Sequence, residues 1–177
     1  MLPDRIETKR LVLRAFSPND VDAVLEYSND PEWSRFQQMP SPFSRLDAEK
    51  RVAELIARDR SSQPTWAMTL GNEVIGIVRL SFECDHRIAV LGYGVQKIHW
   101  GEGLSGEAAR SVVDHAFANY DQLRRIRAQT DLRNARSIRV LEKLGFTHEG
   151  TLRANTFEKG EFVDEAVFGL LREEWPG

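Results

Sequence analysis

The sequence is poor in the features that define several classes of protein. It contains a single cysteine, Cys84, so an internal disulfide is excluded. Its four histidines show no HxxxH-type pairing, and we expect no metal. No apolar run reaches the roughly 18 residues of a membrane span, and residues 1–14 lack the hydrophobic core of a signal peptide. These gaps predict a soluble cytoplasmic protein with no membrane partner.

Charge of one sign is not in excess either. Lys and Arg total 24, Asp and Glu total 27, and the net charge is -3, which argues against nucleic acid as the main partner. The chain has 177 residues, of which 41% are hydrophobic. This length and composition predict one compact domain over residues 1–177 and exclude a disordered chain.

Strand and helix patterns alternate along the chain. Strand-like alternation covers residues 6–14, 65–70, 74–82, 88–96, 124–130, 146–156 and 162–171. Helical patterns begin at Ser17, Ser44, Leu104 and Asn134, and the first two carry a capping signature. Residues 29–44, with three prolines, predict a structured loop. The order β-α-α-β-β-β-α-β-α-β-β predicts an α/β (α+β) protein with helices on the faces of a mixed sheet.

A glycine-rich turn, Trp100-Gly-Glu-Gly-Leu-Ser-Gly106, lies between a strand pattern and a helix pattern. That order directs several backbone N–H groups at one spot, which predicts an anion site. The alternative is a tight turn that needs glycine only for its dihedral angles. The turn also matches the dinucleotide fingerprint GxGxxG, but no repeated βαβ units follow, and Asp121 and Asp131 fall outside the place of a ribose-binding acid.

Four segments in order carry a more specific resemblance. They are TKRLVLR at residues 8–14, LGYGV at 91–95 before the glycine turn, NARS at 134–137 running on to EKLGF at 142–146, and EGTLR at 149–153. With them the chain resembles the GNAT N-acetyltransferases, and among these the ribosomal-protein N-terminal (RimJ/RimL-like) branch. The resemblance implies a mixed, mostly antiparallel sheet of about seven strands flanked by about four helices. It also implies acetyl-CoA as the acetyl donor and a primary amine as the acceptor.

The same resemblance implies roles for individual residues. The backbone of the glycine turn would hold the pyrophosphate of acetyl-CoA, and a bulge near the end of strand 88–96 would free backbone groups for pantetheine and the oxyanion. Ser137 would take the place of the tyrosine that protonates the thiolate in many relatives, where this chain has Leu141. The implied cofactor-binding residues are Val95, Gln96, Lys97, Gly101, Glu102, Gly103, Leu104, Ser105, Gly106 and Asn134, and the implied catalytic residues are Ser137 and Asn134.

Each of these roles has a structural alternative. Asn134 is also a good N-cap, and Ser137 is equally a helix-surface hydroxyl. Trp33, Phe36 and Phe43 either form the wall of the acceptor pocket or anchor their loop. The six arginines between 124 and 139 either meet the 3′-phosphate or are solvated.

The general base has no assignment beyond a guess at Glu158. The competing functions are a non-catalytic acyl-CoA-binding module and an NAD-dependent oxidoreductase. A homodimer is a further expectation.

Overall fold

A computed structural model gives the structure of residues 1–37 and 39–176. Its strands lie close to the predicted segments. In chain order they are β1 (Arg5–Glu7), β2 (Leu11–Arg14), β3 (Thr65–Leu70), β4 (Glu73–Glu83), β5 (Ile88–Val95), β6 (Arg125–Asp131), β7 (Thr147–Glu158) and β8 (Glu161–Leu171). They form one sheet in the order β1-β2-β3-β4-β5-β6-β8-β7.

Strand direction confirms the predicted sheet type. β5 and β6 run parallel, and the other neighbouring pairs of described strands are antiparallel. The sheet is therefore mixed and mostly antiparallel, with eight strands in place of about seven. A largely antiparallel sheet of this kind differs from the parallel sheet of the dinucleotide-binding folds.

The additional strand comes from the N-terminus. Residues 6–14, predicted as one strand, form a hairpin of β1 and β2. Thr8 closes its turn: the Thr8 N–H donates to the carbonyl of Leu11 at 2.9 Å, and the Thr8 hydroxyl accepts from the Leu11 N–H at 2.9 Å. The turn contains neither glycine nor proline, the residues that mark most turns in a sequence, so alternation alone did not reveal it.

The described helices are five in number rather than about four. They are α1 (Val21–Ser28), α2 (Pro31–Ser34), α3 (Arg45–Ala57), α4 (Leu104–Asn119) and α5 (Ala135–Lys143), with short 3₁₀ turns at Pro18–Asp20, Lys97–His99 and Arg172–Glu174. The capping box predicted at Ser44 is present, since its hydroxyl accepts from the Asp47 N–H and the Asp47 carboxylate accepts from the Ser44 N–H. The extra helix, α2, lies within the predicted loop and is capped by Asp30.

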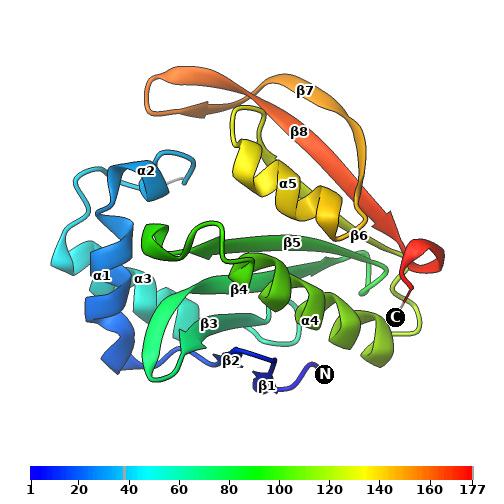
Figure 1. Cartoon of the computed structure of the whole chain (residues 1–177), viewed down its shortest axis with the longest axis horizontal. Coiled ribbons are helices and arrows are strands. Elements are labelled where there is room, and N and C mark those ends of the chain that lie inside the picture. The colour runs from blue at the N-terminus through cyan, green and yellow to red at the C-terminus, as the bar shows by residue number, and fades with distance from the viewer. Residues whose placement is uncertain (38, 177) are drawn as a thin grey trace.

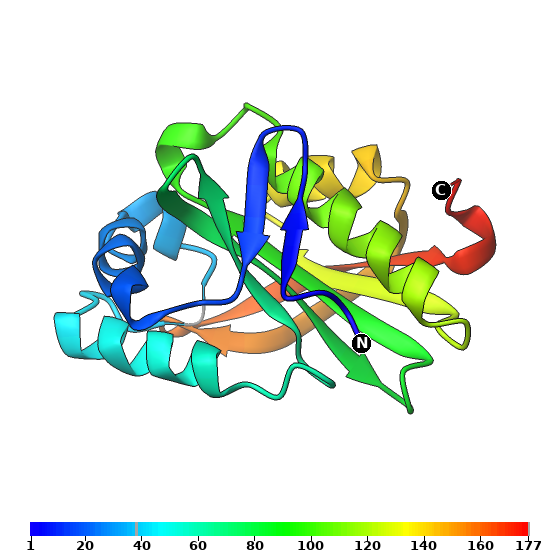
Figure 2. The same ribbon diagram turned by 90° about the horizontal axis from the view of Figure 1, so that it is seen from below.

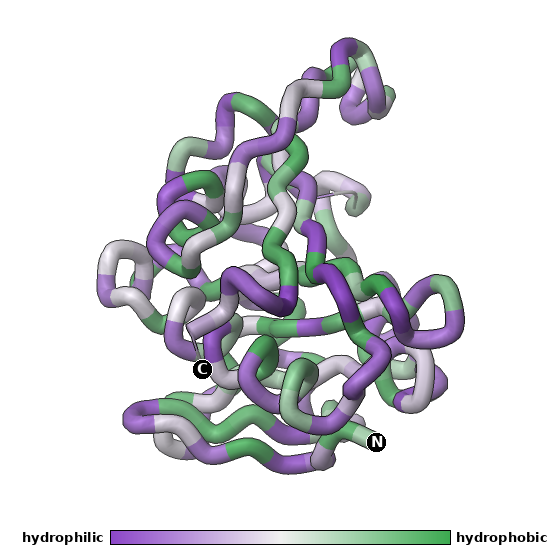
Figure 3. The backbone as a smooth tube through the Cα atoms, turned by 90° about the vertical axis from the view of Figure 1, so that its right-hand side faces the viewer, coloured by the Kyte–Doolittle hydropathy of each residue, from purple (hydrophilic) through white to green (hydrophobic). Residues whose placement is uncertain are grey.

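The helices cover both faces of the sheet. Figures 1 and 2 show α4 on one face and α1 with α3 on the other, while α5 lies beside β6 and β7. The larger buried cluster joins Trp66 and Phe168 of the sheet with Val112 of α4, and the smaller joins Val24 and Val52 of α1 and α3 with the sheet. Hydrophobic and hydrophilic stretches interleave along the backbone (Figure 3), as expected for strands and helices that bury one side. None of the helices in residues 1–37 and 39–176 combines the length and apolarity that a membrane span requires.

A buried ion pair fixes the approach to α1. Asp20 is 4% exposed, and its carboxylate accepts from both terminal nitrogens of Arg14 at 2.8 Å and from the Ser17 N–H at 2.8 Å. Burial alone would raise the pKa of Asp20, but the hydrogen bonds from Arg14 and Ser17 outweigh it and hold the pKa below its ordinary value. Asp20 therefore stabilises the fold while it is ionised, and that stabilisation is lost as the pH falls through its folded pKa.

We expect Asp20→Asn to lower the free energy of unfolding by about 2 kcal/mol at pH 7, because it leaves Arg14 without its charge partner. The deficit relative to wild type should shrink as the pH falls below ~4 towards the lower folded pKa of Asp20, because the unfolded chain takes up the proton first. Urea unfolding at pH 7 and at pH 3 measures both values. Asp22→Asn, at an exposed pair with Arg45, is the control and should change stability by less than about 0.5 kcal/mol. A deficit of equal size at the two pH values would contradict the expectation.

Candidate active site

The site is built around the point where β5 and β6 separate. β5 pairs with β4 along its whole length, with Ile88 opposite Glu83 and Val95 opposite Gly76. Its pairing with β6 covers residues 88–90. The register on β4 is unbroken from one end to the other, so the predicted bulge is absent from this pairing. The strands nevertheless diverge as predicted, and residues 93–95 border a cavity instead of β6.

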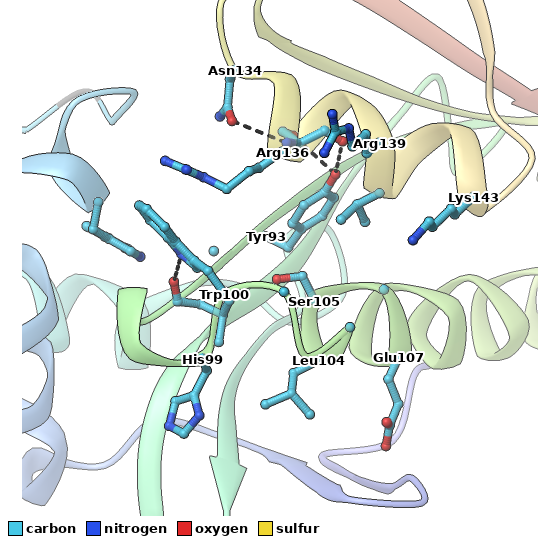
Figure 4. Close-up of a pocket in the computed structure, with 18 of the residues that line it drawn as sticks. Tyr93, His99, Trp100, Leu104, Ser105, Glu107, Asn134, Arg136, Arg139 and Lys143 are labelled. Atoms are coloured by element: carbon cyan, nitrogen blue, oxygen red, sulfur yellow. Dashed lines mark hydrogen bonds between the residues drawn. The ribbon is translucent and has the colours of Figure 1, made fainter.

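This cavity has a volume of about 820 Å³. Its walls come from the end of β5, the first turns of α4, one side of α5, and α2 with the residues after it. Figure 4 shows α5 above the cavity and α4 below it, with Tyr93 directed towards α5. The predicted site residues on its wall are Trp33, Phe36, Val95, Gly101, Gly103, Leu104, Ser105, Gly106, Asn134 and Ser137.

Three predicted cofactor residues are not among those on the wall: Gln96, Lys97 and Glu102. The Gln96 N–H donates to the carbonyl of Ile75 in β4 at 2.7 Å, and the Lys97 ammonium donates to the carboxylate of Glu32 at 2.6 Å. The Glu102 N–H donates to the carbonyl of His99 at 3.5 Å. Each of these three residues thus has a hydrogen-bonding group directed at a protein partner.

The glycine turn presents a row of backbone amides to the cavity. The first intrahelical hydrogen bond of α4 runs from the Glu107 N–H to the Gly103 carbonyl at 3.0 Å. The amides of residues 104–106 therefore precede the first acceptor that the helix can offer them. Gly101 and Gly103 have φ values of +88° and +79°, a region that favours glycine. The glycines thus serve the dihedral angles of a tight turn and, at the same time, leave the amides open to an anion.

Asn134 and Ser137 lie together at the start of α5. The Asn134 side-chain oxygen accepts from the Ser137 N–H at 3.2 Å, so Asn134 is the N-cap of this helix. Such a cap uses the amide oxygen and leaves the amide nitrogen as a donor for another partner. Both residues border the cavity, which is where a catalytic role for Ser137 would require its hydroxyl to lie.

Tyr93 is a residue of this site that the sequence did not single out. Its hydroxyl donates to the Ser137 carbonyl at 3.0 Å and lies 3.1 Å from the Ser137 hydroxyl oxygen. Burial raises the pKa of Tyr93 above its ordinary value, and the hydrogen bond with Ser137 offsets only part of that rise. Tyr93 is therefore a protonated donor at neutral pH. Its position two residues before Val95 was the available signal, because alternate residues of a strand share a side.

Aromatic residues border the cavity at its α2 end, away from the first turn of α4. Trp33 packs on Tyr27 with ring centroids 4.8 Å apart, and its ring lies 3.4 Å from the point where a Cβ on Gly94 would stand. Trp33 and Phe36 border the cavity as predicted, whereas Phe43 is buried in the core beside α1 and α3 and anchors its segment. These contacts place α2 directly against the end of β5.

Charged groups line the cavity unevenly. The Arg136 guanidinium stacks on Trp100, with its central carbon 3.7 Å from the ring centroid, and the Trp100 indole N–H donates to the Val95 carbonyl at 2.9 Å. Of the six arginines between 124 and 139, Arg136 and Arg139 border the cavity. Three others form ion pairs elsewhere, namely Arg125 with Glu149, Arg127 with Glu83, and Arg133 with Asp131. Further cations of the wall are Arg110 and Lys143.

Carboxylates suited to act as a base are scarce on this wall. In the described part of the chain the carboxylates that border the cavity are Glu32 and Glu107, and both are ion-paired, with Lys97 and Arg10. Glu158 borders a separate, smaller cavity. The described residues contain no group of three His, Cys, Asp or Glu side chains that could hold a metal ion.

Comparison with known proteins defines the class. A profile of the acetyltransferase (GNAT) domain matches residues 10–147, so the chain belongs to the GNAT acetyltransferase family. The uncharacterized N-acetyltransferase p20 of Bacillus licheniformis is 29% identical, over 98% of this chain and 99% of that protein. A crystal structure from T. thermophilus, provisionally classed as an acetyltransferase, is 32% identical with a TM-score of 0.87, covering 100% of this chain and 94% of the other.

The ribosomal-protein branch is also represented among the similar structures. RimJ of Mycobacterium smegmatis, solved in complex with CoA-disulfide, covers 99% of this chain and 90% of its own with a TM-score of 0.87. At 23% identity that likeness shows the shared fold. The matched profile and the p20 relative confirm the predicted resemblance to GNAT N-acetyltransferases, and with it the enzyme class, while the RimJ structure of the ribosomal-protein branch shares the fold.

Proposed function

We propose that this N-acetyltransferase uses acetyl-CoA as donor and transfers the acetyl group directly to a primary amine. The observation that carries the proposal is the convergence on one cavity of the α4 amides, the unpaired end of β5 and the Ser137 hydroxyl. The anion site matches the diphosphate of acetyl-CoA, the strand edge matches its pantetheine arm, and the hydrogen-bond donor matches its thioester. The CoA complex of the RimJ structure supports the same ligand.

Acetyl-CoA would lie along the cavity from α4 to α2. The amides of Gly101 and of residues 103–106 would hold the diphosphate at the positive end of the helix dipole. Arg110, Arg139 and Lys143 would meet the 3′-phosphate, because they put positive charge on the same wall. The pantetheine arm would follow the free edge of β5, with the Asn134 amide nitrogen as a donor.

The oxyanion of the reaction would be stabilised by the Val95 N–H. Successive residues of a strand direct their N–H groups to opposite edges. Because the Gln96 N–H donates to β4, the Val95 N–H is directed to the other edge, on the side of the cavity. A donor fixed there before the reaction lowers the barrier without reorganisation.

Ser137 and Tyr93 would assist the leaving group. The amine nitrogen attacks the thioester carbonyl, the C–N bond forms, and the C–S bond breaks as the tetrahedral intermediate collapses. The sulfur leaves as a thiolate that accepts a hydrogen bond from the Ser137 hydroxyl, while the Tyr93 hydroxyl, which donates to the Ser137 carbonyl, lies 3.1 Å from the same serine hydroxyl and positions it. The amine proton leaves through water, since the wall carboxylates are ion-paired.

The acceptor would enter beside Trp33 and Phe36, opposite the diphosphate end. A protein N-terminus and a small-molecule amine both fit this proposal. The single-domain organisation, the cytoplasmic location and the homodimer stay predictions from the sequence.

Ligand-induced stabilisation tests the donor. Acetyl-CoA, CoA, NAD and NADP are added separately, and the shift in unfolding temperature is recorded. A ligand at 100 times its Kd stabilises by about 2.7 kcal/mol, so we expect clear shifts with acetyl-CoA and CoA and none with the nicotinamides. Stabilisation by NAD without stabilisation by CoA would favour the oxidoreductase and overturn the proposal.

Thiol release tests turnover. Acetyl-CoA is mixed with a panel of peptide N-termini, polyamines and amino sugars, and free CoA is measured. Release that depends on one amine class establishes the enzyme and its acceptor. Binding of acetyl-CoA with no release across the panel would favour the non-catalytic acyl-CoA-binding module.

A further inference from the structure

One side chain of the N-terminal hairpin contacts both the glycine turn and the first turn of α4. Arg10, in the turn between β1 and β2, donates from Nη1 to the carbonyl of Glu102 at 2.9 Å. Its Nε donates to the carboxylate of Glu107 at 2.7 Å, and its backbone N–H donates to the same carboxylate at 2.7 Å. Arg10 therefore connects the last residue before Gly103 with the first turn of α4.

The contact with Glu107 controls an unfavourable charge. Glu107 lies in the first turn of α4, where its carboxylate competes with a bound anion. It also accepts from the Thr8 hydroxyl at 2.6 Å, and its side chain is 17% exposed. Burial would raise the pKa of Glu107, but the hydrogen bonds from Thr8 and Arg10 outweigh it and lower the pKa. The carboxylate is thus ionised, neutralised by Arg10 and directed away from α5 (Figure 4).

The contact with Glu102 controls the direction of an amide. A trans peptide is planar, so its C=O and N–H point in opposite directions. The Glu102 carbonyl points to Arg10, and the Gly103 N–H of the same peptide therefore points away from Arg10. Gly101 and Gly103 on either side are both at positive φ, and glycine allows a peptide to rotate at little cost. Arg10 is the contact that holds this peptide in one orientation.

We propose that Arg10 is a positioning residue for diphosphate binding. It keeps the Gly103 N–H directed at the ligand and cancels the Glu107 charge beside it, without touching the ligand itself. This assignment rests on the proposed function, because it takes the diphosphate of CoA as the anion bound by the turn. It extends the site to two strands that the cavity wall does not include.

Binding of CoA to Arg10 variants tests the proposal. Calorimetry with CoA should give a Kd about tenfold higher for Arg10→Ala than for wild type. This is the loss expected when one charge-assisted hydrogen bond, here from the Gly103 N–H to phosphate, is no longer made. Arg10→Lys keeps the charge but cannot bridge Glu102 and Glu107 together, and its Kd should lie between the two. Arg5→Ala is the matched control, since Arg5 lies on β1 of the same hairpin and pairs with exposed Glu7. Its Kd should equal that of wild type.

Phosphorus NMR of bound CoA separates positioning from a general loss of structure. At saturating CoA, the diphosphate resonances should shift towards their free values in both Arg10 variants, whereas the 3′-phosphate resonance should stay where it is in wild type. A parallel shift of all three phosphates, or an unchanged Kd in Arg10→Lys and Arg10→Ala, would overturn the assignment. If wild type failed to bind CoA, the proposed function itself would be overturned. If wild type and both Arg10 variants bound CoA equally well, only the assignment of Arg10 would be overturned.

Discussion

Gly103→Glu is expected to raise the Kd for CoA by at least about 100-fold, the largest binding effect that this site predicts. Gly103 is the N-cap of α4 at φ +79°, and a Cβ there would lie 3.8 Å from the Arg10 guanidinium. The new carboxylate would be drawn to Arg10 or to the free amides of the turn, and either contact displaces an anionic ligand. It would also repel the diphosphate directly.

Gly71→Glu is the matched control for this variant. Gly71 is also at positive φ, at +59°, and no atom lies within 4 Å of its notional Cβ. It lies in the turn between β3 and β4, outside the cavity wall. The two variants therefore share the backbone strain and the added charge, and only one alters the turn. Calorimetry with CoA should find Gly71→Glu unchanged, and an unchanged Kd in Gly103→Glu would place the ligand elsewhere.

Ser137→Ala is expected to lower kcat by about 10- to 100-fold while the Kd for CoA changes less than about twofold. The hydroxyl would donate to the sulfur as negative charge develops there, so its removal weakens the transition state more than the bound substrate. Turnover is measured as thiol release at saturating acetyl-CoA, with the amine that the acceptor panel identifies. Ser111→Ala, in α4 and away from the cavity wall, should leave both constants unchanged.

The hydroxyl of Tyr93, next to Ser137, gives a second test of this mechanism. Tyr93→Phe should lower kcat by a smaller factor, because Ser137 can still donate to the sulfur alone. If the two hydroxyls act as one unit, the double variant should be no slower than about the Ser137→Ala enzyme. Since burial raises the pKa of Tyr93, its contribution should persist from pH 7 to pH 9. A fully additive double variant would contradict the shared role, and a normal kcat in Ser137→Ala would remove the serine from the mechanism.

Local patterns predicted those parts of the site that local rules determine. The glycine turn, the cap at Asn134 and the helix that ends before Gly145 each depend on residues adjacent in the sequence, and each was found where predicted. The strands of the central sheet followed in the same way from alternation. Their bounds shifted by a residue or two, as at β5, which ends at Val95.

Local sequence patterns could not predict contacts between residues that are distant in the sequence. Arg10 and Glu107 are 97 positions apart, and Tyr93 and Ser137 are 44 apart, so neither pair is visible before the topology is known. Gln96 and Lys97 adjoin Val95 in the sequence but are not on the cavity wall, because the Gln96 N–H is directed to β4 and the chain leaves the strand after Val95. Their contacts with the cofactor stay predictions. Which residues face the cavity depends on the direction that each residue takes in the folded chain, and not on its proximity to Val95 in the sequence.

The hydrogen bonds between the N-terminal turn and α4 also connect folding with ligand affinity. Closing so long a stretch of chain carries an entropic cost, which is recovered when Thr8 and Arg10 meet Glu107. If the diphosphate of CoA requires this arrangement, as proposed, it would bind only the closed state, and its binding free energy would add to the free energy needed to open the first two strands. Amide exchange in β1 and β2 should therefore slow when CoA is added, although neither strand is part of the cavity wall.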